Sequence, residues 1–344
     1  MNYRPVFIAG CDRSGTTLLG DMLGNARWTF TTPESQFLHD LVLQLRLGSF
    51  GSPEQAAAWL LDHFRYVAWG LPLSLPELAG LIDLQSPRLS MQRLLARYIE
   101  HTHPQKTHAD VWIDHTPDNF KYHSMLKWLF PEARFIHIVR DGRAVCNSIK
   151  NLHWGPNNAY AASRHWATRL QEALSVEVAE AENCLRVRFE DLLTEPTKTM
   201  QKVCAFIDVP FDRNMLNGGG LQLPVFTRQQ HDLVGKPPQS SRKDNWRQSL
   251  SDAELRDFES YPLSHTMLKT LGYEPTHPAP PKLSMGRTLG CYCHDFSRYL
   301  VNRLHHRRLE RRTLSKHRDL IKGCCEKTSP KRSADVTAST PQHN

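Results

Sequence analysis

The stretch that most constrains the fold is Pro5 to Asn25, PVFIAGCDRSGTTLLGDMLGN. Its first part, Val6 to Ala9, is a short apolar run typical of a strand that is buried on both faces. Gly10 and Gly15 then bracket a tight turn, after which apolar residues recur at helical spacing as far as Asn25. Such a unit directs free backbone N–H groups and the positive end of a helix toward one point. The sequence therefore predicts an anion site at this turn.

The spacing from Gly10 to Thr17 is that of a Walker phosphate loop in which Thr16 replaces the usual lysine. A kinase or NTPase needs that lysine and Mg²⁺, because the phosphoryl group in transfer is highly charged. Here Arg13 supplies a cation on the near side of the loop. A sulfuryl group carries less negative charge, so backbone amides, hydroxyls and one cation suffice without a metal. The loop thus favours sulfuryl transfer, and a tight turn without a ligand is the alternative that this motif alone leaves open.

Composition predicts an ordinary soluble protein with a sizeable core, since 40% of the 344 residues are hydrophobic. The N-terminal MNYRPVFIAG enters the first strand almost at once, and no apolar run approaches the roughly 18 residues of a membrane span. We therefore expect a cytoplasmic protein. The eight cysteines show no paired metal spacing in the first 290 residues, which favours reduced thiols, and we expect no metal cofactor.

The net charge of +8 belongs to the C-terminal segment, because residues 283–344 hold 13 Lys or Arg against 5 Asp or Glu. We expect a catalytic domain over 1–282 and a basic tail over 283–344 that is helical at first and then disordered. The tail could dock on an anionic membrane surface or an acidic acceptor, or be a solvated appendage.

Four predicted strands alternate with helices: Val6 to Ala9, Val111 to Ile113, Arg134 to Val139 and Cys184 to Arg188. This order predicts an α/β fold with a P-loop-like, mostly parallel central sheet flanked by helices. A helical insert of about residues 37–105 is expected to form a wall over the site. Its aromatic residues would belong to the core or line an acceptor pocket.

A second basic turn follows the strand that ends at Val139. Arg140, Arg143 and Lys150, with the hydroxyl of Ser148, surround a second helix start, as in a phosphate site. The alternative is that Arg140 and Arg143 form ion pairs on the surface with Asp141 and nearby carboxylates. A later loop of some thirty residues ends in Ser241, Arg242 and Lys243, which could fold over a bound anion.

Taken together, GCDRSGTTLL and VRDGRAVCNSIK lie in order about 125 residues apart. With them the chain resembles, over about residues 4–275, the sulfotransferases that use 3′-phosphoadenosine 5′-phosphosulfate (PAPS), especially tyrosylprotein sulfotransferases and their bacterial relatives. The resemblance implies that PAPS is the sulfuryl donor. It implies a 5′-phosphosulfate site formed by Arg13, Ser14, Gly15, Thr16 and Thr17, and a 3′-phosphate site formed by Arg140 and Ser148.

The resemblance also implies roles in catalysis. Glu34, in a PES turn, would be the base that accepts a proton from the acceptor, with a solvated carboxylate or a helix cap as its alternative. Arg13 would assist the sulfuryl group. His115 stands where relatives often carry a lysine, so the leaving group would meet an imidazolium or a neutral donor. Ser241, Arg242 and Lys243 would belong to the loop that closes over the cofactor, and Phe189 replaces a tyrosine that is frequent in relatives.

These observations leave three function classes. The leading one is a sulfotransferase that acts in line on the hydroxyl of a carbohydrate, lipid or peptide. A nucleotide kinase or NTPase is opposed by the missing lysine. A non-catalytic nucleotide- or anion-binding module is the third, with the basic tail attached to a membrane or to nucleic acid; for the leading class we expect no nucleic acid partner.

Overall fold

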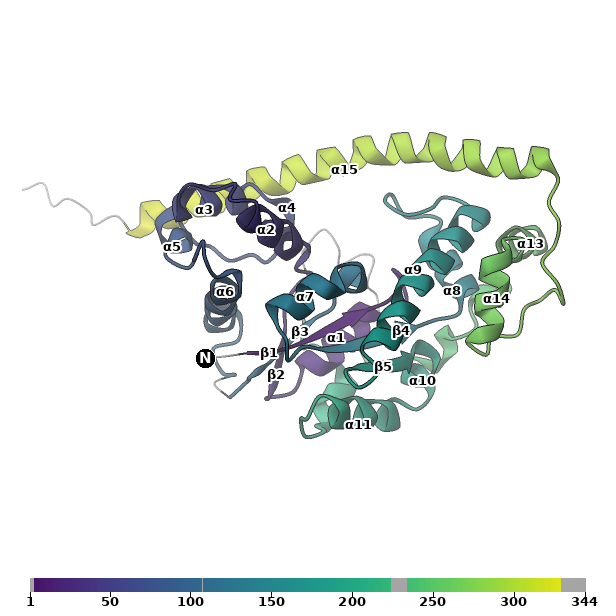
Figure 1. Ribbon diagram of the computed structural model, residues 1–344, viewed down its shortest axis with the longest axis horizontal. Coiled ribbons are helices and arrows are strands. Elements are labelled where there is room, and N and C mark those ends of the chain that lie inside the picture. Colours follow the sequence, from purple (N-terminus) through teal and green to yellow (C-terminus); the bar gives the residue numbers. More distant parts are fainter. Residues whose placement is uncertain (1–2, 107, 224–233, 329–344) are drawn as a thin grey trace, which may run out of the picture.

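The computed structural model describes residues 3–106, 108–223 and 234–328, with side chains described as far as Lys316. Its centre is a sheet of five strands in the order β2-β3-β1-β4-β5, and every neighbouring pair is parallel (Figure 1). The strands are β1 (Arg4–Ala9), β2 (Thr29–Thr31), β3 (Val111–Asp114), β4 (Arg134–Val139) and β5 (Cys184–Arg188). The predicted α/β fold with a parallel sheet is confirmed. The sequence indicated four strands, because β2 is only three residues long and too short to show a pattern.

Side chains of β1 alternate between two cores. Val6 and Ile8 pack with α1 (Thr16–Gly24), α10 (Phe189–Thr194) and α11 (Pro196–Phe206) on one face of the sheet. Phe7 and Ala9 pack on the other face with α2 (Gln36–Arg46), α6 (Pro87–Thr102) and α7 (His123–Leu129). All four side chains are at most 3% exposed. Helices thus cover both faces of the sheet, as expected of a continuous apolar strand.

The predicted insert is helical and contains α2, α3 (Pro53–Leu61), α4 (Phe64–Val67), α5 (Leu75–Ala79) and α6. Ser52 caps α3, since its side chain accepts from the backbone N–H of Gln55. Among its aromatic residues, Tyr66 and Trp69 are buried in the core, and Trp59 packs against the same cluster. Most of these aromatics therefore build the core.

Two segments whose sequence pattern predicts a single helix are interrupted. The pattern of residues 120–130 predicts one helix, but the segment begins as a 3₁₀ helix, η1 (Pro117–Tyr122), and continues as α7. The pattern of residues 252–271 also predicts one helix, but the segment is divided into α13 (Asp252–Glu259) and α14 (Pro262–Thr270). Pro262 causes the second break, because proline has no N–H to donate and its ring clashes with the preceding turn. The remaining elements are α8 (Gly142–Ile149), α9 (Ala159–Ala179), η2 (Arg213–Asn217), η4 (Ser240–Arg242) and α12 (Trp246–Ser249).

The C-terminal segment forms the helix α15 (Met285–Thr328), which is longer than the basic helix over residues 298–322 that the sequence pattern predicts. It runs from the side of α13 and α14 across the molecule to the helices of the insert, and it contacts α4 and α9 (Figure 1). Its inner face is packed rather than solvated over its first half. In the part of the chain that the structure describes, no helix combines the length and the apolar character of a membrane-spanning segment. The end expected to be disordered, 329–344, lies outside the described residues, and the predicted boundary at residue 282 stays a prediction.

Candidate functional site

A cavity of ≈ 1190 Å³ opens at the carboxyl ends of the strands, the edge at which open α/β sheets bind ligands. Small-molecule pockets usually measure about 300–1,000 Å³, so this cavity has room for more than one ligand. Its walls come from the turn after β1, the turn after β2, α8, α9 and α15. Residues that line it include Asp12, Arg13, Gly15, Thr16, Thr17, Glu34, Gln36, Phe64, Arg65, Asp118, Arg140, Ser148, Arg164, His165, Arg169, Arg242, Tyr299, Arg303 and His306.

The turn after β1 presents its anion site to the cavity. Gly15 has a φ of 104°, and a Cβ at this position would lie 2.4 Å from Cδ2 of Phe189, so only glycine fits here. Helix α1 starts directly after it with Thr16, and Asn25 ends the helix as predicted. The Oγ of Ser14 is buried and has no hydrogen-bond partner among the described residues. This arrangement leaves a polar cradle at a helix N-terminus, which suits a phosphate or a phosphosulfate.

The second basic turn meets the first one. Arg13 donates from Nε to Oγ of Ser148 over 3.1 Å, and Arg140 donates from Nη1 to the carbonyl oxygen of Arg13 over 2.7 Å. The Arg140 guanidinium also lies over the Phe189 ring, 4.4 Å from its centroid. Burial lowers the pKa of Arg140 to about 10, which keeps it protonated at neutral pH. The residues predicted to bind the 5′-phosphosulfate and those predicted to bind the 3′-phosphate thus lie together at one side of the cavity.

Two of the three cations in this turn have structural partners instead. Arg143 is buried and pairs with Asp141 at 2.8 Å and with Glu259 at 3.2 Å. Lys150 pairs with Glu254. The expectation that all three cations surround a phosphate is therefore wrong for Arg143 and Lys150. The alternative of an ion pair with Asp141 holds for Arg143, but the pair is buried and not on the surface. A buried arginine needs such carboxylates to offset its lost hydration.

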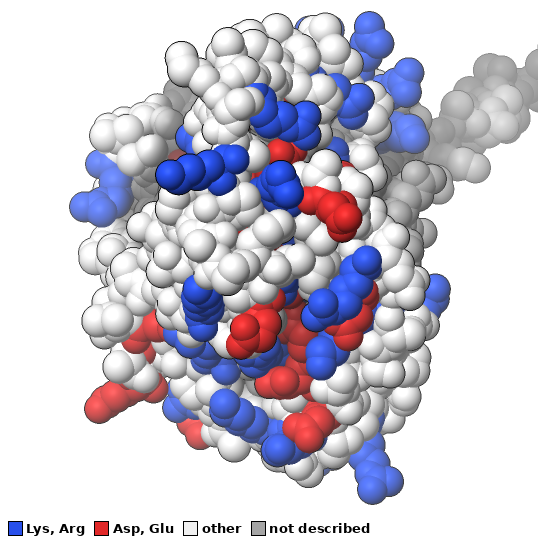
Figure 2. Space-filling model, turned by 90° about the vertical axis from the view of Figure 1, so that its right-hand side faces the viewer, with Lys and Arg blue, Asp and Glu red and all other residues white. Residues whose placement is uncertain are grey.

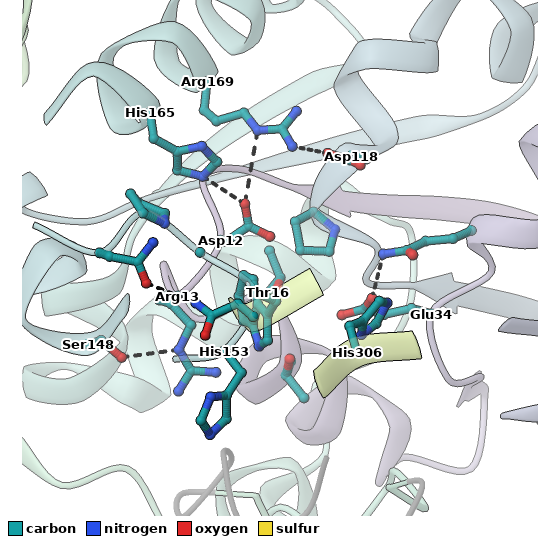
Figure 3. Close-up of a pocket in the computed structure, with 18 of the residues that line it drawn as sticks. Asp12, Arg13, Thr16, Glu34, Asp118, Ser148, His153, His165, Arg169 and His306 are labelled. Carbon is teal, nitrogen blue, oxygen red and sulfur yellow. Dashed lines mark hydrogen bonds and ion pairs between the residues drawn. The ribbon is translucent and has the colours of Figure 1, made fainter. Parts of the chain in front are cut away.

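Glu34 lies across the cavity from Arg13 and Ser148, with Thr16 between them in the view of Figure 3. Its side chain is half-buried, and Oε2 accepts from Nε2 of Gln36 over 2.8 Å. Burial raises the pKa of Glu34 to about 7; the cation of Arg65 opposes this rise, and nearby carboxylates add to it. Glu34 is therefore not a fully solvated carboxylate, which was one alternative to a catalytic role. A carboxyl with this pKa is suited to accept a proton near neutral pH.

His115 follows β3 but is not among the residues that line the cavity. Its ring is buried against α1, where a Cβ at Gly20 would lie 3.1 Å from the His115 Cβ. Neither ring nitrogen has a hydrogen-bond partner in the described part of the chain, and burial lowers the pKa of His115 to about 4. The imidazole is therefore neutral in this arrangement, and its role in catalysis stays a prediction.

Of the three residues predicted to close over the cofactor, only Arg242 lines the cavity. Ser241 and Lys243 are exposed neighbours within η4 or directly after it. The loop that leads to them is fastened to α1 by Asp21, whose buried carboxylate accepts from the backbone N–H groups of Gly219 and Leu221 at 3.0 Å and of Gly235 at 2.7 Å. Sequence reasoning missed this anchor.

Other lining residues were also missed. Asp12 accepts from Nε2 of His165 at 3.0 Å, and Arg169 pairs with Asp118, which ties α9 to the turn after β1 and to η1 (Figure 3). Helix α15 also lines the cavity, through Asp295, Tyr299, Asn302, Arg303, His306 and Leu309. No local motif marks these residues, because they reach the cavity only through the path that α9 and α15 take in the folded chain. Within the described residues no group of three or more His, Cys, Asp or Glu could hold a metal, and the expected independence of metal stays a prediction.

Comparisons with known proteins show which family the sequence matches. Residues 5–213 match the model of the "Sulfotransferase family". Protein-tyrosine sulfotransferase A of Caenorhabditis elegans is 29% identical over 177 residues, which cover 48% of this chain and 45% of that protein. Protein-tyrosine sulfotransferase 1 of Danio rerio is 25% identical over 288 residues, 80% of this chain and 74% of that protein.

The fold is also found among solved structures. A sulfotransferase domain from the curacin biosynthetic pathway superposes with a TM-score of 0.54 at 20% sequence identity, covering 80% of this chain and 99% of that domain. At this identity the likeness concerns the fold alone. The matched family model, however, spans more than half of the chain and includes Arg13, Glu34, Arg140 and Ser148. The chain therefore belongs to the sulfotransferase family.

Proposed function

We propose that this protein transfers the sulfuryl group of PAPS to a hydroxyl group of an acceptor, with Glu34 as the general base. One observation carries the proposal. A single cavity joins an anion cradle with an unpartnered, buried Ser14 Oγ to a carboxyl whose pKa is about 7. In this family PAPS supplies an activated sulfuryl group, and the charges of the cavity fit such a donor.

The donor would be held by the two joined turns. The backbone N–H groups at the start of α1 and the hydroxyls of Ser14, Thr16 and Thr17 suit the 5′-phosphosulfate. Arg140 and Ser148 suit the 3′-phosphate, and Arg242 lies where it can add a third cation. The hydrogen bond from Arg13 to Ser148 supports a shared role, since the Arg13 cation would then lie near both anionic groups of the donor.

Glu34 would accept the proton of the acceptor hydroxyl while that oxygen attacks sulfur. At neutral pH a carboxyl with a pKa of about 7 is present both as base and as acid, which is the favourable range for proton transfer. The hydrogen bond from Gln36 fixes one of its oxygens. The resemblance implies that His115 stabilises the leaving group. Because its buried ring is neutral, it would do so as an uncharged hydrogen-bond donor and not as an imidazolium.

The acceptor would bind at the other end of the cavity. There Phe64, Arg65, Tyr299 and His306 present aromatic rings and cationic or polar groups. Because the relatives are named protein-tyrosine sulfotransferases, a tyrosine-containing peptide is one candidate acceptor. A carbohydrate and a lipid with a free hydroxyl group are the other candidates.

The test is thermal unfolding of the full chain with 3′-phosphoadenosine 5′-phosphate (PAP), with 5′-AMP and with Mg-ATP. Each ligand is compared on the wild type, on Arg140→Ala and on the control Arg134→Ala. Arg134 begins the strand that Arg140 follows, and it pairs with Asp208 outside the cavity. A ligand at about 100 times its dissociation constant stabilises by roughly 2.7 kcal/mol, a shift of a few degrees.

We expect PAP alone to stabilise the wild type and Arg134→Ala, and Arg140→Ala to lose the effect. Equal or greater stabilisation by Mg-ATP, or none by PAP, would overturn the proposal in favour of phosphoryl transfer or of a different binding function.

A further inference from the structure

Helix α15 exposes an apolar stripe to solvent. Its members recur at spacings of four or seven residues, so they lie on one side of the helix. They are Met285 (87% exposed), Leu289 (62%), Phe296 (64%), Leu300 (49%) and Leu304 (60%). A row of large apolar side chains of this length is unusual on the surface of a soluble protein and indicates a surface that binds a partner.

The orientation of α15 is fixed by its opposite, inner side. Asn158 donates from Nδ2 to the carbonyl oxygen of Cys291 over 2.8 Å, and Asn302 donates from Nδ2 to Oδ1 of Asn157 over 2.9 Å. Asp295 accepts from the backbone N–H of Asn157 at 2.8 Å. Because these contacts are buried or partly buried, the helix does not turn its apolar stripe inward without breaking them.

Cations accompany the stripe. Residues 285–316 contain eight Lys or Arg and two Asp or Glu. Both carboxylates are engaged, Asp295 by Asn157 and Glu310 by His306 at 3.2 Å. No ion pair with a described carboxylate forms at Arg298, Arg303, Arg307, Arg308, Arg311, Arg312 or Lys316. By contrast, positive (blue) and negative (red) side chains are intermixed over the lower part of the face near α13 and α14 (Figure 2).

We propose that α15 docks this protein on an anionic lipid surface. Phe296, Leu300 and their apolar neighbours enter the interface, and the arginines of the following turns contact lipid phosphates, as in amphipathic helices that lie in the membrane plane. A second copy of the chain is a poorer partner, because it offers the same positive charge. The same helix lines the cavity through Tyr299, Arg303 and His306, so docking holds the cavity beside the membrane.

The experiment is sedimentation of the full chain with vesicles of phosphatidylcholine alone and of phosphatidylcholine with about one third phosphatidylglycerol. The double variant Phe296→Ser/Leu300→Ser tests the stripe. Its control is Leu43→Ser/Leu47→Ser, two exposed leucines at 52% and 68% that lie on or next to α2 and are not part of α15. The stabilisation of each variant by PAP reports, independently of lipid, whether its fold and cavity are intact.

We expect binding to the anionic vesicles only, lost at high salt. The α15 variant should bind at least about tenfold more weakly, and the α2 control should bind as the wild type does. Equal binding to both kinds of vesicle, no binding to either, or unchanged binding of the α15 variant would each overturn the proposal. Dimerisation that the α15 variant abolishes, in the absence of lipid binding, would assign the stripe to a second copy instead. Docking does not depend on the reaction, so either proposal can fail alone.

Discussion

Replacing Glu34 by glutamine gives the sharpest prediction, because this carboxyl affects rate and stability in opposite directions. Glu34→Gln keeps the size of the side chain and its contact with Gln36 but removes the base. We expect sulfuryl transfer to fall by about 10²–10⁴-fold, the usual contribution of a general base. In the wild type the rate should rise with pH through about 7, as the carboxyl ionises, and then level off. Residual transfer by the variant should lack this rise.

The stability effect follows from the same pKa. The folded state holds the Glu34 proton up to about pH 7, whereas the ordinary value is 4.5, so wild-type stability falls as pH rises through this window. The difference corresponds to at most about 3 kcal/mol at pH 8, less what solvent screens at this half-buried carboxyl. Glu34→Gln should therefore be more stable than the wild type at pH 8 and equal to it at pH 4.

Urea unfolding of the protein without nucleotide measures this difference at the two pH values. The matched control is Glu100→Gln on α6, an exposed carboxyl that pairs with Arg97 and lies outside the cavity. If Glu34→Gln is no more stable than the wild type at pH 8, the raised pKa is refuted. If the variant also transfers sulfuryl groups at the wild-type rate, Glu34 is not the base.

Three further substitutions test the surrounding structure. Gly15→Ala brings a Cβ to 2.4 Å from Phe189, so we expect calorimetric PAP binding to be lost, and Phe189→Ala in that background to restore part of it; unchanged affinity would contradict the geometry. Asp21→Ala leaves backbone N–H groups unpaired and should lower the free energy of unfolding by about 1–3 kcal/mol in urea, whereas an unchanged value would mean that the anchor contributes nothing. His115→Asn should leave transfer within about tenfold, because the ring lies outside the cavity; a larger loss at unchanged PAP affinity would support the leaving-group role.

Local features of the fold were predictable from the sequence because local patterns determine them. The apolar run of β1, the glycines of its turn and the start of α1 appear in the structure where the pattern indicated. The sequence did not indicate β2, because a strand of three residues is too short to show a pattern. It did not indicate the helix break at Pro262 either, because the helical spacing of apolar residues continues across this proline.

From the residues alone the site was predictable only near the ends of recognised strands. Arg13 and Arg140 line one cavity because β1 and β4 are parallel and end at the same edge of the sheet. Glu34 and the role of Ser148 came from the resemblance to a known family, and both residues line the same cavity. The sequence did not show that Arg143 turns into a buried ion pair, since that depends on Glu259, more than a hundred residues away. Nor did it show that α15 returns across the cavity, because no local motif encodes which face of a long helix meets the rest of the chain.

Transfer of label from radiolabelled PAPS tests the central claim most directly. The full chain would be incubated with the donor and a mixture of tyrosine-containing peptides, carbohydrates and lipids, beside Glu34→Gln, Arg140→Ala and the control Glu100→Gln. We predict labelled acceptor, separated from the donor by chromatography, with the wild type and the control, and little with either cavity variant, although Glu34→Gln still binds PAP. Undiminished labelling by Glu34→Gln, or no labelled acceptor from a protein that binds PAP, would contradict the account.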